Sequence, residues 1–170
     1  MTIKVYAIEK VVLFGDSLMA GYGLSNEYHL SVVLKESLIS DGLNIEVING
    51  SVSGSTSSGG LNRAEWTLSE NGIDLMILCL GANDMLRGIN PKETKNNLQE
   101  IIKIAQEKKI KVIIVGMIAP SSYGIEYKKI FDTIFQELSY QYNLSDGMHP
   151  NDKGTIIISN TLKKAIMENL

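Results

Sequence analysis

Apolar and polar residues follow one another along this chain in a pattern that predicts strands alternating with helices. Short apolar runs, bounded by glycine or polar residues, predict four buried strands at residues 11–14, 45–48, 73–80 and 111–117. Between them, apolar residues recur at the three- and four-residue spacing of amphipathic helices. The predicted helices are residues 30–40, 61–70, 91–105 and 125–142, and a last helix that Asn151 caps and that runs through Leu162 and Ile166. In the 125–142 helix we expect Ile130, Phe131 and Ile134 on the inner side.

Strands that alternate with helices are typical of a doubly wound α/β fold with a parallel sheet. Residues 112–115 are β-branched throughout, as expected of a parallel strand that is covered on both faces. The chain has 170 residues, of which 44% are hydrophobic, and no repeat, low-complexity tract or linker divides it. We therefore expect a single domain over residues 1–170.

Charge and cysteine content narrow the function classes. The balance of 16 Lys and Arg against 19 Asp and Glu gives a net charge of −3 without any basic cluster, which argues against nucleic acid as a partner. The single cysteine, Cys79, lies inside an apolar run, so we expect a small buried side chain and not a catalytic thiol. Neither a signal peptide nor a spanning helix is apparent, so a cytoplasmic location is expected, or a periplasmic or secreted one if a leader has been removed.

A serine stands where the first predicted strand ends. Residues 11–14 run into Gly15, Asp16 and Ser17, and open parallel sheets bind ligands outside the carboxyl ends of their strands. Ser17 is therefore a candidate nucleophile, and a serine hydroxyl needs a general base, a group that orients the base, and donors for the oxyanion.

The chain offers two histidines as the base. His29 has no carboxylate spaced to orient it other than Glu27, and we interpret it as an ordinary packing or surface residue. His149 follows Asp146 by three positions in a tight loop, so that the carboxylate can hold the ring while its other nitrogen takes a proton from Ser17. Taken alone, this spacing fits a helix-entry turn equally well.

Two further loops at strand ends can supply the oxyanion hole. The candidate donors are the backbone N–H groups of Ser17 and Gly54 and the side-chain amide of Asn83. Singly, Gly54 and Asn83 are ordinary turn residues. Jointly, the order serine, glycine, asparagine and Asp-x-x-His favours catalysis.

These blocks resemble a known family. Residues 15–18, 49–54, 81–84 and 146–151 look like the four signature blocks of the GDSL, or SGNH, hydrolases. Residues 59–63, 85–88 and 123–127 are similar to the branch of that family containing thioesterases, arylesterases and lysophospholipases.

The resemblance implies a flavodoxin-like three-layer α/β/α sandwich and acyl hydrolysis without a metal or organic cofactor. By family role, Ser17 is the nucleophile, Gly54 and Asn83 complete the oxyanion hole, and His149 is the base with Asp146 behind it. The implied substrates are small esters or thioesters, including aryl esters, short-to-medium acyl chains and lysophospholipids. Members of this branch have a fifth strand and a substrate-facing loop before the Asp-x-x-His block, where this chain has only residues 143–145. Either the loop is deleted, which opens the acyl pocket, or the sequence omits a mobile rim.

Other functions stay open. A phosphate or nucleotide binder would use the same glycine-rich strand ends, but the chain lacks both the phosphate-loop and the dinucleotide-binding fingerprints. A carbohydrate O-acetyl esterase, or a non-catalytic lipid or carbohydrate binder with a shortened loop, also fits the scaffold. Apolar residues expected near the site favour an acyl or aryl group over a sugar acetyl: Leu18, Met19, Met85, Ile118 and Tyr123. The oligomeric state is left open.

Overall fold

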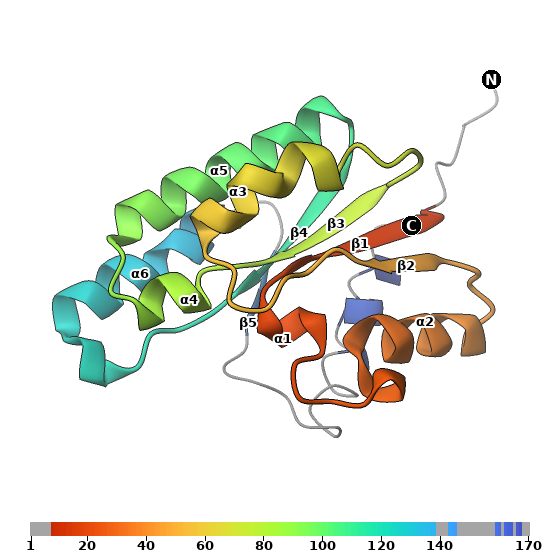
Figure 1. The fold of residues 1–170 in the computed structure, drawn as a ribbon, viewed down its shortest axis with the longest axis horizontal. Helices are drawn as coiled ribbons and strands as arrows, with labels where there is room; N and C mark the ends of the chain where they lie inside the picture. The colour runs from red at the N-terminus through yellow and green to blue at the C-terminus, as the bar shows by residue number, and fades with distance from the viewer. Residues whose placement is uncertain (1–7, 139–142, 146–158, 161, 165, 168–170) are drawn as a thin grey trace.

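The computed structural model describes residues 8–138, 143–145, 159–160, 162–164 and 166–167. Within these residues a five-stranded parallel sheet separates two layers of helices (Figure 1). The strand order is β2-β1-β3-β4-β5, and every neighbouring pair is parallel. The strands are β1 Lys10–Gly15, β2 Glu46–Asn49, β3 Leu75–Cys79, β4 Lys111–Gly116 and β5 Asn143–Ser145. The predicted α/β/α fold class is confirmed.

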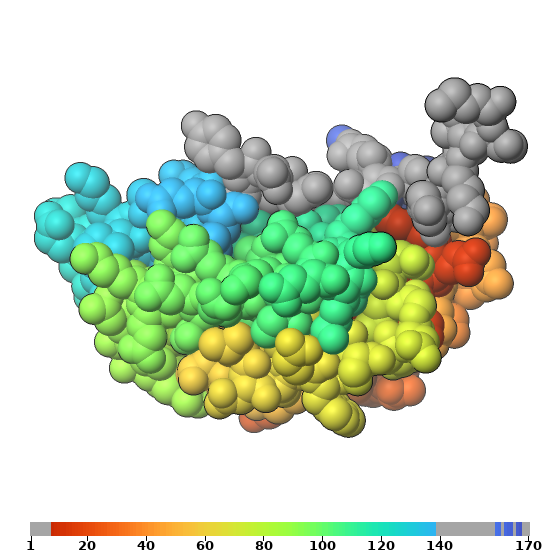
Figure 2. All heavy atoms as spheres, turned by 90° about the horizontal axis from the view of Figure 1, so that it is seen from above, coloured from red at the N-terminus to blue at the C-terminus, as the bar shows by residue number. Residues whose placement is uncertain are grey.

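The helices are divided between the two faces of the sheet. Helices α3, α5 and α6 cover one face, and in Figure 2 α5 and α6 make up most of the surface seen from that side. Helix α2 lies on the other face, and Lys163 near the end of the chain forms an ion pair with Asp41 at the end of α2 (2.8 Å). The helices are α1 Ser17–Ala20, α2 Leu30–Ser40, α3 Ser57–Thr67, α4 Ala82–Leu86, α5 Pro91–Glu107 and α6 Ile125–Leu138, with short 3-10 turns at Asn26–Tyr28 and Ser121–Tyr123.

The central strands are buried on both faces. All five residues of β3 are buried, as are the last five of β1. This explains why both strands read as unbroken apolar runs and not as alternating ones. Because these strands are parallel, their carboxyl ends meet at one end of the sheet, where α1, α4 and the loop after β2 are found (Figure 1).

Several helix predictions are confirmed. Asn90 caps α5 by accepting a hydrogen bond from the Lys92 N–H (3.0 Å), with Pro91 at the first helical position. Leu162 and Ile166 are helical and buried. Asn151, the predicted cap of that last helix, lies outside the described residues.

Other predictions need correction. Residues 143–145, which stand where relatives of this branch have a fifth strand and a substrate-facing loop, were not predicted as a strand but form β5 and pair with Ile114, Val115 and Gly116 of β4. Strand pairing uses backbone groups, so three residues suffice beside a buried neighbour, although they are too few to show a pattern. Two segments interpreted as loops after Ser17 and Gly81 are the short helices α1 and α4.

Two helix details also differ. Helix α3 begins at Ser57 and not at Leu61, because the Thr56 hydroxyl accepts a hydrogen bond from the Gly59 N–H (3.2 Å) and caps the helix earlier. On α6, Ile130 was expected on the inner side but is 42% exposed, whereas Phe131 and Ile134 are buried. Ile130 falls one position off the stripe that faces the sheet.

None of the helices among the described residues combines the length and the apolar character needed to cross a membrane. The compartment stays a prediction from the sequence.

Substitution of Gly15 tests how closely β1 and β3 approach next to Ser17. A Cβ at this position would lie 2.8 Å from the Cys79 carbonyl oxygen, which belongs to the neighbouring backbone and cannot rotate away. Gly15→Ala is expected to lower the free energy of unfolding by about 1–3 kcal/mol, measured by urea denaturation. The exposed helical substitution Ser58→Ala is the control and should change it by less than about 0.5 kcal/mol. Equal stability of the two variants would show that the strands can separate to admit the methyl group.

Candidate active site

Three of the predicted site residues occupy neighbouring strand ends. Ser17 is the first residue of α1 after β1, Gly54 lies in the loop between β2 and α3, and Asn83 is in the first turn of α4 after β3. Since β2, β1 and β3 are neighbours in the sheet, these three segments lie beside one another. Hydrogen bonds between the segments fix their arrangement.

Asp16 organises the turn that carries Ser17. Its carboxylate is fully buried and accepts a hydrogen bond from the Leu18 N–H (3.0 Å), which caps α1. Gly21 ends this helix in the left-handed conformation (φ 86°). Ser17 itself is half-buried and stands at the head of a helix of only four residues. Its hydroxyl is therefore carried on a tight, capped turn.

The Asn83 amide connects the Ser17 turn with the Gly54 loop. Its Nδ2 group donates to Asp16 Oδ2 (3.2 Å) and to the Ser55 carbonyl oxygen (3.1 Å). Asp16 precedes Ser17 and Ser55 follows Gly54. One side chain thus brings together three segments that the sequence places in the same site.

Gly54 lies in a tight turn that Arg87 contacts. The Ser55 N–H donates to the Val52 carbonyl oxygen (3.1 Å), and Gly54 has a φ of 78°, a value that glycine adopts without strain. Gly54 is exposed, and among the described residues its N–H has no hydrogen-bond acceptor. Arg87 Nη2 donates to the Gly54 carbonyl oxygen (3.0 Å).

A buried carboxylate anchors α4, the helix that carries Asn83. Asp84 is fully buried, and its Oδ2 accepts from the Ser57 N–H (2.7 Å). Its Oδ1 accepts from the Ser57 hydroxyl and from the Thr94 hydroxyl (3.2 Å). Asn97 adds a hydrogen bond to the Ser57 hydroxyl (3.0 Å). Helix α4 is thereby fixed to the start of α3 and to α5.

Arg63 of α3 binds the carboxyl ends of the strands. Its guanidinium donates to the Gly50 and Gly15 carbonyl oxygens (2.5 and 3.0 Å) and lies 3.9 Å above the centre of the Phe14 ring. Burial lowers the pKa of this group. The peptide before Asp16 is therefore held by a side chain of α3.

The remaining sequence predictions divide into two groups. Asp146 and His149, the predicted orienting carboxylate and base, lie outside the described residues. His29 packs against Gly21 and its Nε2 lies 3.3 Å from the Leu24 carbonyl oxygen, in keeping with a packing role. Cys79 is buried, and burial together with the negative charge of Asp16 raises its pKa, so the thiol stays protonated.

Comparison with known proteins bears on this arrangement. The model of the GDSL-like lipase/acylhydrolase family matches residues 13–139, which include Ser17, Gly54 and Asn83. The chain belongs to this family. It is a serine ester hydrolase.

Individual relatives agree with this assignment. An arylesterase from Vibrio mimicus is 30% identical over 182 residues, which cover 96% of this chain and 91% of the relative. Thioesterase 1/protease 1/lysophospholipase L1 from Escherichia coli K12 is 26% identical, covering 98% of this chain and 87% of its own. Among solved structures, the SGNH-hydrolase family esterase AlinE4 is 32% identical over 98% of each chain, with a TM-score of 0.76.

Sequence reasoning missed Asp84 and Arg87. Both stand inside quoted motifs, next to Asn83 and in the 85–88 stretch, but their partners Ser57 and Gly54 lie 27 and 33 residues away along the chain. The one signal in the sequence was that an acidic residue, Asp84, directly follows Asn83.

Removal of the Asp84 carboxylate tests whether it anchors α4. Asp84→Ala would leave the Ser57 N–H and the Ser57 and Thr94 hydroxyls buried without their acceptor. We expect a loss of about 3 kcal/mol in the free energy of unfolding, measured by urea denaturation. The exposed Glu107→Ala variant serves as the matched control for loss of a carboxylate and should stay within about 0.5 kcal/mol. A similar small change in Asp84→Ala would rule out the anchor.

Proposed function

We propose that this protein hydrolyses small carboxylic esters or thioesters through an acyl-enzyme formed on Ser17, with His149 as general base and Asp146 orienting it. The observation that carries this proposal is the Asn83 amide, which joins the Ser17 turn to the Gly54 loop. An acyl-transfer site needs its nucleophile and oxyanion donors in one place. Here three separate motifs of the sequence are tied together by one side chain.

The proposed cycle has two steps. The Ser17 Oγ attacks the acyl carbon while His149 takes the hydroxyl proton. The tetrahedral intermediate then collapses and releases the alcohol or thiol, which His149 protonates. Water, deprotonated by the same histidine, then attacks the acyl-enzyme and releases the acid. The N–H groups of Ser17 and Gly54 and the amide of Asn83 are the proposed donors to the oxyanion.

The Asn83 amide can reach the oxyanion only by changing its present partners. An amide nitrogen carries two hydrogens, and both are used, by Asp16 Oδ2 and by the Ser55 carbonyl oxygen. Asn83 must therefore share or exchange one of these bonds when the negative charge forms. The Gly54 N–H, in contrast, has no such bond to give up within the part of the chain that the structure describes.

Apolar side chains around this end of the sheet favour an acyl or aryl substrate. Val52 and Ile118 follow β2 and β4, Leu86 is the last residue of α4, and each is more than half exposed. Val52 belongs to the Gly54 turn and Leu86 precedes Arg87, so two of them flank the proposed oxyanion hole. Exposed apolar side chains at the proposed site fit an acyl or aryl group better than a sugar acetyl.

Hydrolysis of p-nitrophenyl esters of increasing acyl length tests the activity. We expect turnover in the wild type with an optimum among short and medium chains, and a loss of most turnover in Ser17→Ala or His149→Ala because each removes a reacting group. Thioesters of matching acyl length, followed by thiol release, separate a thioesterase from an esterase. Wild-type rates in Ser17→Ala would contradict the proposed nucleophile, and no hydrolysis at any length would point to a binding role.

Asn83→Ala tests the proposed oxyanion hole separately. Loss of one oxyanion donor is expected to lower kcat by about 10²–10³-fold, with a smaller change in KM. The variant also loses two hydrogen bonds between loops, so its thermal midpoint has to be measured beside the rate. An unchanged kcat in a folded variant would remove Asn83 from the site.

A further inference from the structure

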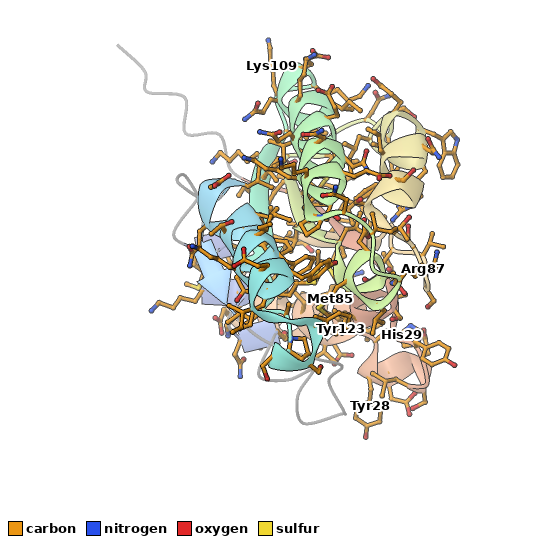
Figure 3. The ribbon with its side chains drawn as sticks, turned by 90° about the vertical axis from the view of Figure 1, so that its left-hand side faces the viewer. Tyr28, His29, Met85, Arg87, Lys109 and Tyr123 are labelled. Carbon is orange, nitrogen blue, oxygen red and sulfur yellow. The ribbon has the colours of Figure 1, made fainter. Side chains whose placement is uncertain are left out.

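Arg87 contacts the loop that carries the proposed oxyanion donor. It follows the last residue of α4, is exposed, and donates from Nη2 to the Gly54 carbonyl oxygen at 3.0 Å (Figure 3). Within the part of the chain that the structure describes, Arg87 forms no ion pair. Among the described residues, the guanidinium of Arg87 is therefore held by its hydrogen bond to Gly54.

The turn at Gly54 has two available forms, and they point its N–H in different directions. Val52 to Ser55 form a β-turn closed by the hydrogen bond from the Ser55 N–H to the Val52 carbonyl oxygen. Gly54 occupies the third position with a φ of 78°, the value of a type II turn. In a type I turn the third residue has a negative φ, and the peptide between the second and third positions is rotated by about half a turn. That peptide contains the Gly54 N–H.

The carbonyl side of this turn is held by α4. Asn83 and Arg87 lie one helical turn apart, on the same side of α4, and donate to the consecutive carbonyl oxygens of Ser55 and Gly54. These two hydrogen bonds hold the Gly54–Ser55 part of the turn against α4, and so fix its position relative to the Asn83 amide. Helix α4 can fix this position because Asp84 anchors it to α3 and α5.

We propose that Arg87 is a positioning residue that holds the Val52–Ser55 turn at the distance from α4 at which the Gly54 N–H and the Asn83 amide can both donate to the oxyanion. This inference rests on the proposed function and assigns Arg87 a part in it. Arg87 does not touch the reacting atoms. It acts through Gly54, so its contribution to turnover disappears once the Gly54 donor has been lost.

The experiment is a double-mutant cycle between Arg87 and Gly54, with p-nitrophenyl acetate as substrate. The variants are Arg87→Met, Arg87→Lys, Gly54→Ala and the double variant Arg87→Met/Gly54→Ala. Alanine keeps the N–H at position 54 but disfavours a φ of 78°, so Gly54→Ala favours the type I form, in which this N–H points away from the oxyanion. Lys92→Met, an exposed change at the start of α5 that removes the same charge, is the matched control. Thermal midpoints are measured for all of them.

Arg87→Met is expected to lower kcat about 10-fold while KM and the thermal midpoint stay near wild type, as expected for one lost hydrogen bond from a charged donor. Arg87→Lys keeps a donor and should recover part of the loss, and Lys92→Met should match wild type. The double variant should turn over like Gly54→Ala alone.

Two results would overturn the inference. A wild-type kcat in Arg87→Met would show that the turn keeps its position beside α4 without this hydrogen bond. Losses that multiply in the double variant would show that Arg87 acts on the charge of the oxyanion directly, or on stability, and not through Gly54. Neither result resembles a failure of the proposed function, which would appear as full activity in Ser17→Ala or as an inactive wild type.

Discussion

The site depends on the bridge that the Asn83 amide makes between Asp16 and Ser55. The other hydrogen bonds between the β1 and β2 ends, which include those of Arg63, Asn49 and the Val52 N–H, reach carbonyl oxygens and not a carboxylate. The bridge ends on a buried carboxylate, and a hydrogen bond to a charged acceptor is stronger than one between neutral groups. It therefore sets the distance between the Ser17 turn and the Gly54 loop, and among the described residues it leaves the Gly54 N–H without an acceptor.

The bridge is rigid because the helix that carries it is held by a buried polar cluster. A helix of five residues cannot sustain itself through its own hydrogen bonds. Asp84 fixes α4 to α3 and α5 through three hydrogen bonds. The buried strands β1 and β3 lead directly into α1 and α4. Polar groups that are costly to bury are tolerated here because each finds a partner. The layers of the fold therefore serve to place two short helices at the end of a parallel sheet.

Much of this was predictable from the sequence because the fold converts chain order into position. Apolar runs located β1 and β3, and the rule that parallel strands end together placed Ser17, Gly54 and Asn83 at one edge. Helices α1 and α4 escaped prediction because four or five residues show no helical period. The Asp84–Ser57 and Arg87–Gly54 hydrogen bonds join residues from different loops, and their geometry arises only when the strands are assembled. Ile130 was misplaced because an apolar residue on α6 need not lie on its buried stripe.

The proposed mechanism requires an activated serine at position 17, and covalent labelling can detect it. The wild-type protein would be treated with diethyl p-nitrophenyl phosphate, an organophosphate that reacts with serines activated by a general base, and digested for peptide mass spectrometry. We expect one diethylphosphoryl adduct, on the peptide containing Ser17, and a loss of ester hydrolysis in proportion to the labelling. The urea-unfolded protein should form no adduct. An adduct on a different serine, or ester hydrolysis that persists after Ser17 is fully labelled, would contradict the proposed mechanism.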